Sequence, residues 1–184
     1  MAEETNTSLL ELVGVASQMI VDAGISESRV IGSIDQLDRR TYVRTVFALI
    51  EGVSFCQRRH AENDPQLTEG ERENARSAAD AAWRAGQRAG ERMKACLRVR
   101  SAVAALAAAH SLDDPLDTKS NAWRRFQEAV EVRNRITHPK TLADCIVKDD
   151  DVTLVREVHA WYQAMDMALT AKIQGTSSSA RETG

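Results

Sequence analysis

The segment R-N-R-I-T-H-P at residues 133–139 brings an arginine, an asparagine and a histidine together in the sequence. Histidine gives or takes a proton near neutral pH, because its unperturbed pKa is about 6.5. Arginine stays charged and presents a planar fork that fits phosphate oxygens. Arg133 and His138, with Asn134 available to hold a phosphate oxygen or orient the imidazole, therefore suit metal-independent cleavage of RNA. In that reaction the ribose 2′-hydroxyl attacks the adjacent phosphate, while histidine moves protons and arginine stabilises the charged transition state.

The position of this segment at the end of a predicted helix decides whether its side chains can meet. The helix is expected to begin near Thr118 or Ser120 and to be stopped by Pro139. On an ideal helix, Arg133 and His138 diverge by about 140°. Because proline disfavours the α conformation in the residue before it, we expect His138 to leave the helix and to turn towards Arg133. The alternative is that His138 is a helix-terminal cation that interacts with the last carbonyl groups.

The spacing of arginine and histidine alone is a weak signal. Chance predicts about 0.4 Arg-x4-His pairs in a chain of this composition, and about 0.01 when asparagine must follow the arginine. The asparagine and the helix end therefore make the motif informative.

The wider segment resembles a known family. R-N-R-I-T-H-P is preceded by W-R-R-F at residues 123–126 and followed by an acid-started helix that contains Trp161. In these features the chain resembles HEPN domains, small helical bundles found in prokaryotic toxins, phage-defence systems and CRISPR ribonucleases. The resemblance is specific over residues 118–165 and looser over residues 42–58.

The resemblance implies a metal-independent endoribonuclease without a cofactor, in which two Arg-x4-His motifs of a homodimer meet in one cleft. Arg133 and His138 would be the catalytic pair, and Asn134 the polar residue after the arginine. Some HEPN toxins carry, two residues after the histidine, a tyrosine that a nucleotidyltransferase antitoxin modifies. Lys140 stands there in this chain, which puts that form of regulation in doubt. Many HEPN domains are inactive, so the alternative is a non-catalytic binding or regulatory subunit, alone or in a larger defence complex.

A single acidic residue is a candidate for supporting the motif. Glu51 lies four residues from both Phe47 and Phe55, at the edge of an apolar helical stripe. A partly buried carboxylate there could pair with Arg133 and fix its conformation, as HEPN nucleases are often found to do. The alternative is an ordinary solvated glutamate.

Further basic residues are candidates for RNA binding. Arg84, Arg88 and Arg92 are four residues apart and share one helical face, where they could follow a phosphate backbone. Exposed charge that keeps the protein soluble is the competing interpretation. Arg135 and Lys140, beside the motif, complete the set of RNA-binding candidates.

Metal binding, disulfide bonding and export are not predicted. The other histidines lack ligand spacing, and the three cysteines form no C-x-x-C pair. The acidic start M-A-E-E lacks the positive charge of a signal peptide, and no run of about 20 apolar residues is present. These features predict a cytoplasmic protein without a membrane helix. The residues concerned are His60, His110, His159, Cys56, Cys96 and Cys145.

The composition favours an all-α fold, because 27 alanines stand against 9 glycines and 3 prolines. We expect one domain over residues 1–174, a HEPN-like bundle of about five helices, and a disordered tail over residues 175–184. Capping boxes at Ser8/Glu11 and Thr68/Glu71 mark two helix starts, and Asp149–Asp151 mark a third. The expected helices span about 8–24, 35–60, 68–110 with a break near Gly86 or Gly90, 118–137, and 149–173.

Overall fold

A computed structural model describes residues 9–91 and 93–182. Over these residues the protein is built from six α-helices and one short 3-10 turn, without strands, which confirms the predicted all-α bundle. The elements are α1 (Leu9–Val30), α2 (Gln36–Asn63), α3 (Glu69–Arg88), α4 (Lys94–Ala109), α5 (Asn121–Thr137), η1 (Leu142–Cys145) and α6 (Asp149–Glu182).

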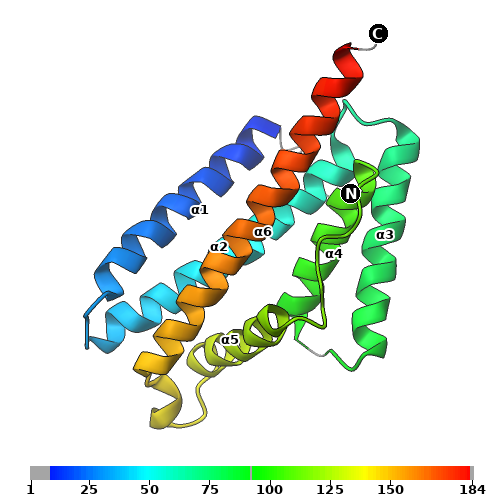
Figure 1. The fold of residues 1–184 in the computed structure, drawn as a ribbon. Helices are drawn as coiled ribbons and strands as arrows, with labels where there is room; N and C mark the ends of the chain where they lie inside the picture. Colours follow the sequence, from blue (N-terminus) through cyan, green and yellow to red (C-terminus); the bar gives the residue numbers. More distant parts are fainter. Residues whose placement is uncertain (1–8, 92, 183–184) are drawn as a thin grey trace, which may run out of the picture.

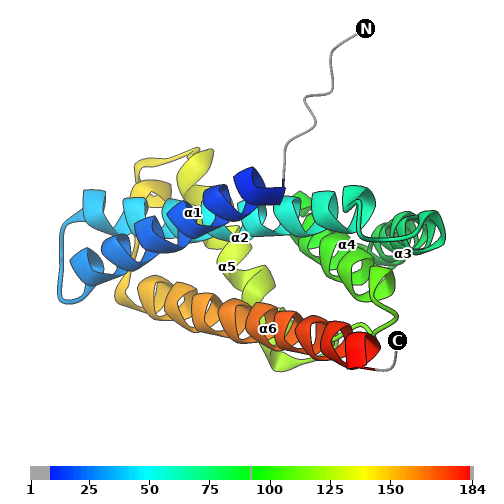
Figure 2. The same ribbon diagram turned by 90° about the horizontal axis from the view of Figure 1, so that it is seen from above.

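The helices are arranged in two layers joined by α5. Helices α1 and α2 lie side by side and antiparallel, as do α3 and α4 (Figure 1). Figure 2 shows these four helices on one side of the molecule and α6 on the other, with α5 crossing between them. Helix α5 contacts both α2 and α4, and its C-terminal end reaches the middle of α2 through Arg133 and Glu51.

The core lies where α2, α4, α5 and α6 meet. The predicted apolar stripe of α2 is buried at Val43, Val46, Phe47, Ile50 and Val53, and the Phe47 ring stacks on Phe126 of α5 at 6.2 Å between centroids. Phe55, two residues further along the same helix, is 60% exposed and lies outside the buried stripe.

The two tryptophans flanking the motif belong to the core. Trp123 is buried, and its ring centroid lies 5.2 Å from that of Phe126 and 6.3 Å from that of Trp161. This aromatic cluster anchors the start of α5 against α6, so these rings serve the packing of the core.

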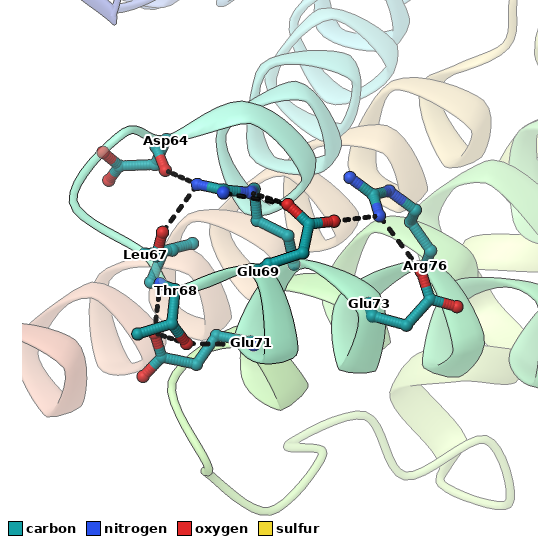
Figure 3. Close-up of polar contacts among 8 residues, drawn as sticks. Asp64, Leu67, Thr68, Glu69, Glu71, Glu73 and Arg76 are labelled. Atoms are coloured by element: carbon teal, nitrogen blue, oxygen red, sulfur yellow. Dashed lines mark hydrogen bonds and ion pairs between the residues drawn. The ribbon is translucent and has the colours of Figure 1, made fainter.

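Short polar side chains fix the starts of several helices. Asp35 accepts a hydrogen bond from the Leu37 amide at the start of α2, and Ser120 accepts one from the Trp123 amide at the start of α5. The predicted capping box of Thr68 and Glu71 is present at the start of α3 (Figure 3). Such caps each stabilise a helix by about 1 kcal/mol. The other predicted capping box depends on Ser8, which lies outside the described residues.

Two glycines end helices, while a third does not. The expected end of the first helix at Gly24 is wrong, because α1 continues to Val30 and buries Ala23 and Val30 against the core. The chain turns at Gly32, which has φ +74°, a left-handed conformation that glycine adopts without strain. The expected break in the long Ala- and Arg-rich stretch is confirmed between α3 and α4, where Gly90 has φ +82°.

Helix α6 ends later than its sequence predicts. The helical backbone continues beyond Ile173 to Glu182, through most of the range 175–184 that was expected to be a disordered tail. No proline follows Pro139 to stop the helix, and one internal glycine costs a helix only about 1 kcal/mol. No described helix combines the length and the apolar character needed to cross a bilayer.

Candidate functional site

An open cleft of about 830 Å³ lies where the C-terminal end of α5, the N-terminal end of α4, the middle of α2 and the turn η1 come together. It gathers Arg133, Asn134 and His138, as well as Glu51 from α2. Its charged lining consists of the cations Lys94, Arg98, Arg133, Arg135 and Lys140 and the anions Glu51, Glu131 and Asp144. The cleft is thus locally basic in a chain with a net charge of −3.

The guanidinium of Arg133 is held from two sides. Its Nη2 donates to Oε1 of Glu51 at 2.7 Å, and its Nη1 donates to Oδ1 of Asn134 at 3.2 Å. The side chains of Arg133 and Glu51 are 29% and 19% exposed, so Glu51 is not an ordinary solvated glutamate. Charge-assisted hydrogen bonds of this kind restrict an arginine to one geometry while leaving it at the cleft surface.

Glu51 also binds a second arginine, which the sequence did not single out. Nη1 of Arg98, on α4, donates to Oε2 of Glu51 at 2.8 Å. One carboxylate therefore joins α2, α4 and α5 at the cleft. The local signal in the sequence is the spacing of Lys94 and Arg98, which places two cations one helical turn apart on one face. Their meeting with Glu51 depends on the packing of α4 against α2, which no local pattern encodes.

His138 has left the helix, as the following proline predicts. It is the C-terminal cap of α5, with φ −127° and ψ 60°, and its backbone N–H donates to the carbonyl of Asn134. The exposed imidazole lines the cleft that Arg133 also lines. Among the described side chains, those of residues 11–91 and 93–175, and the described backbone, this imidazole has no hydrogen-bond or ion-pair partner, so it does not bind the last carbonyl groups of the helix.

The backbone that follows His138 is held in place by the carboxylate of Asp144. Asp144 accepts hydrogen bonds from the backbone amides of Lys140 and Thr141 and from the Thr141 hydroxyl. These bonds, the Lys140 amide first, hold the pKa of Asp144 below its ordinary value. The side chain of Lys140 stays exposed at the cleft.

Arg135 lies at the cleft with its guanidinium already engaged. It donates to the carbonyl of Ile146 at 2.6 Å and to the carboxylate of Asp151 at 2.8 Å. These bonds fasten α5 to the start of α6. Arg135 therefore has fewer free donors for a ligand than its position in the motif suggests.

The basic face of α3 is separate from the cleft. Arg84 is exposed, donates to the carbonyl of Asp80 and lies 3.7 Å from its carboxylate. Arg88 is also exposed, and neither residue lines the cleft. Arg92, the third member of the predicted face, lies outside the described residues.

Other reactive groups are poorly placed for chemistry. Burial raises the pKa of the thiols of Cys56 and Cys96, so neither is an activated nucleophile. No group of three or more potential metal ligands occurs among the side chains that the structure describes, those of residues 11–91 and 93–175. His60 and His110 stack on each other at 6.0 Å between ring centroids, away from the cleft.

No protein-family model, no curated protein and no solved structure matches this chain.

Proposed function

We propose that this chain is a metal-independent endoribonuclease of HEPN type. The observation that carries the proposal is the gathering of Arg133, Asn134 and His138 in one open, basic cleft, with the guanidinium of Arg133 held by Glu51. These are the residue types that the motif at 133–139 suggested, and all three line the same cleft.

The reaction follows from the chemistry of these groups. A neutral His138 imidazole takes the proton from a ribose 2′-hydroxyl as the 2′-oxygen forms a bond to the adjacent phosphorus. The bond from phosphorus to the 5′-oxygen breaks, and that oxygen takes a proton from an imidazolium. The products carry a 2′,3′-cyclic phosphate and a 5′-hydroxyl. Arg133 binds the phosphate oxygens while their negative charge increases in the transition state.

The need for two proton transfers favours a homodimer. His138 is the one histidine among the described residues that line the cleft, and one imidazole cannot act as base and acid at the same moment. A second copy would supply the second imidazole if the two clefts face each other. A measurement of mass in solution tests this part of the proposal, because a strict monomer at the concentration used for cleavage contradicts it.

The biological role that accompanies this activity is that of a toxin or phage-defence effector in the cytoplasm. Such an effector would be restrained by an antitoxin or by a larger defence complex. This role depends on the resemblance to HEPN domains in the segment around residues 133–139.

A non-catalytic binding or regulatory subunit is the second candidate. It is favoured by the engagement of Arg133, whose Nη1 and Nη2 already have protein partners in Asn134 and Glu51. The same basic cleft would then hold an anionic ligand without cleaving it.

Cleavage of RNA in EDTA separates the two candidates. We expect the wild type to cut RNA, and His138→Ala and Arg133→Ala to lose at least about 100-fold of that activity. Arg124→Ala is a matched control, because Arg124 is an exposed arginine of the same helix that does not line the cleft. Equal activity in all variants, or none in any of them, contradicts the nuclease proposal.

A further inference from the structure

The cleft has a second cationic wall that the proposed reaction does not use. The α5 wall carries Arg133, Asn134 and His138, and the facing α4 wall carries Lys94 and Arg98. Both α4 residues are exposed and stand one helical turn apart, so their side chains point from the same face of the helix.

Lys94 is an unusual residue for its position. It begins α4, whose first turn contains no acidic residue and whose N-terminal cap, Met93, makes no side-chain hydrogen bond. A helix N-terminus carries a partial positive charge, so a lysine there is unfavourable by about 0.3–1 kcal/mol. By contrast, α3 and α6 begin with acidic residues. A departure from local preference at a cleft indicates a functional role for the residue.

The cations of this wall are available to a ligand. Within the part of the chain that the structure describes, the ammonium of Lys94 has no hydrogen-bond or ion-pair partner. The side chain of Arg98 is 55% exposed, and its one hydrogen bond to a described residue runs from Nη1 to Glu51. The remaining donors of Arg98 are free to bind oxygen atoms of a ligand.

The charge balance indicates how many phosphates fit. The charged lining of the cleft holds five cations and three anions, so two positive charges remain after the opposite charges are balanced. The two remaining positive charges match two phosphodiester groups. The volume of about 830 Å³ lies in the upper part of the range of about 300–1,000 Å³ typical of small-molecule sites, which leaves room for more than one phosphate.

We infer that Lys94 and Arg98 form a second phosphate subsite, which binds the phosphodiester next to the scissile one in single-stranded RNA. This inference rests on the proposed function, because Arg133 is taken to hold the scissile phosphate. The substrate is then a chain of at least two phosphodiesters that crosses from the α5 wall to the α4 wall. A dinucleotide with a single phosphodiester cannot fill both subsites.

The experiment measures binding instead of cleavage. Fluorescence anisotropy with a 2′-O-methylated RNA hexamer, whose 2′-oxygens cannot attack, is compared with a 2′-O-methylated dinucleotide over a series of salt concentrations. Lys94→Ala is the test variant, because the exposed Lys94 side chain has no partner among the described residues and its removal breaks no contact there. Lys119→Ala is the matched control, since Lys119 is an exposed lysine outside the cleft. Lys94→Arg keeps the charge.

We expect Lys94→Ala to weaken binding of the hexamer about fivefold and to reduce the slope of log affinity against log salt by about 0.7. Lys94→Arg and Lys119→Ala should match the wild type, and all proteins should bind the dinucleotide equally. Hexamer binding by Lys94→Ala that equals that of Lys119→Ala overturns the inference. The inference is also overturned if Lys94→Ala weakens binding of the dinucleotide as much as it weakens binding of the hexamer.

The same assay identifies the source of the phosphates. A nucleoside diphosphate also presents two adjacent phosphates, so its displacement of the hexamer at comparable concentration would overturn the assignment to an RNA chain. Failure of the nuclease proposal appears separately, as absence of RNA cleavage by the wild type. That result leaves the comparison of Lys94→Ala with Lys119→Ala unchanged.

Discussion

The carboxylate of Glu51 lies 2.7 Å from the guanidinium of Arg133 and joins the middle of α2 to the last turns of α5. The same carboxylate binds Arg98 through its other oxygen. The position of Arg133 at the cleft is therefore set by an acid that is distant in the sequence and only slightly exposed.

Glu51→Gln tests this positioning role. The amide keeps the shape of the side chain but loses its charge, so Arg133 should become less ordered and RNA cleavage should fall about tenfold or more. The free energy of unfolding should fall by about 1–3 kcal/mol. Thermal unfolding and initial cleavage rates measure the two effects.

Glu62→Gln is the control for that variant. Glu62 has the same exposure as Glu51 and pairs with Arg58 on the same helix at 2.7 Å, outside the cleft. We expect it to lower stability without changing cleavage. If Glu51→Gln and Glu62→Gln cleave RNA equally well, Glu51 does not position Arg133 for the reaction.

The helices were predictable where local chemistry defines their ends. Asp35, Thr68 and Ser120 accept amide hydrogen bonds at helix starts, and this preference can be recognised from the sequence. The end of α1 could not be read from Gly24, because a glycine inside a helix is tolerated when packing continues beyond it. Tertiary contacts at Val30 decide that end.

The part of the candidate site that lies within residues 133–139 could be predicted from the sequence. The motif at 133–139 identified Arg133 and His138 together, because Pro139 determines how the helix ends. The place of Glu51 at the edge of the apolar stripe, together with the resemblance to HEPN domains, suggested Glu51 as a partner of Arg133. Arg98 could not be inferred, since its place beside Glu51 depends on how α4 packs against α2.

The exposed arginines of α3 allow a second test of where RNA binds on the protein. Arg84 and Arg88 are exposed and do not line the cleft, so any contact they make with RNA is remote from the reacting phosphate. We expect the double variant Arg84→Ala/Arg88→Ala to raise KM for long RNA while kcat stays unchanged. A fall in kcat would place these residues closer to the reaction than the structure does.

Stability should depend on pH through His159. Burial lowers the pKa of this histidine below its ordinary value of 6.5, against the attraction of Glu27, whose Oε2 lies 3.5 Å from Nδ1. Arg156 binds the same carboxylate. Because the unfolded chain takes up the proton more readily, this contribution to stability is present above about pH 6.5 and is lost as the pH falls towards the folded-state pKa.

The measurement for His159 is urea unfolding at about pH 7.5 and about pH 5. We expect His159→Gln to lose less stability than the wild type between these two values. His110, whose pKa burial also lowers, is present in both proteins and cancels in the comparison. An identical loss in both proteins would contradict the role assigned to His159.

Two glycines should respond to alanine in opposite directions. Gly90 has φ +82° in the turn that leads into α4, so Gly90→Ala should destabilise the protein by about 1–2 kcal/mol. Gly24 lies within α1, and a Cβ added there meets nothing within 4 Å. Gly24→Ala should therefore stabilise the protein by up to about 1 kcal/mol. Equal effects of the two substitutions in thermal unfolding would contradict this account of the turns.

The most direct test of the central claim is mass spectrometry of the RNA fragments formed in EDTA by the wild type and by His138→Ala. We expect the wild type to leave 2′,3′-cyclic phosphate and 5′-hydroxyl ends, and His138→Ala to leave the RNA intact. Fragments with 3′-hydroxyl ends, or the same fragments from His138→Ala at the same rate, would contradict attack by the 2′-hydroxyl with His138 as the proton-transfer group.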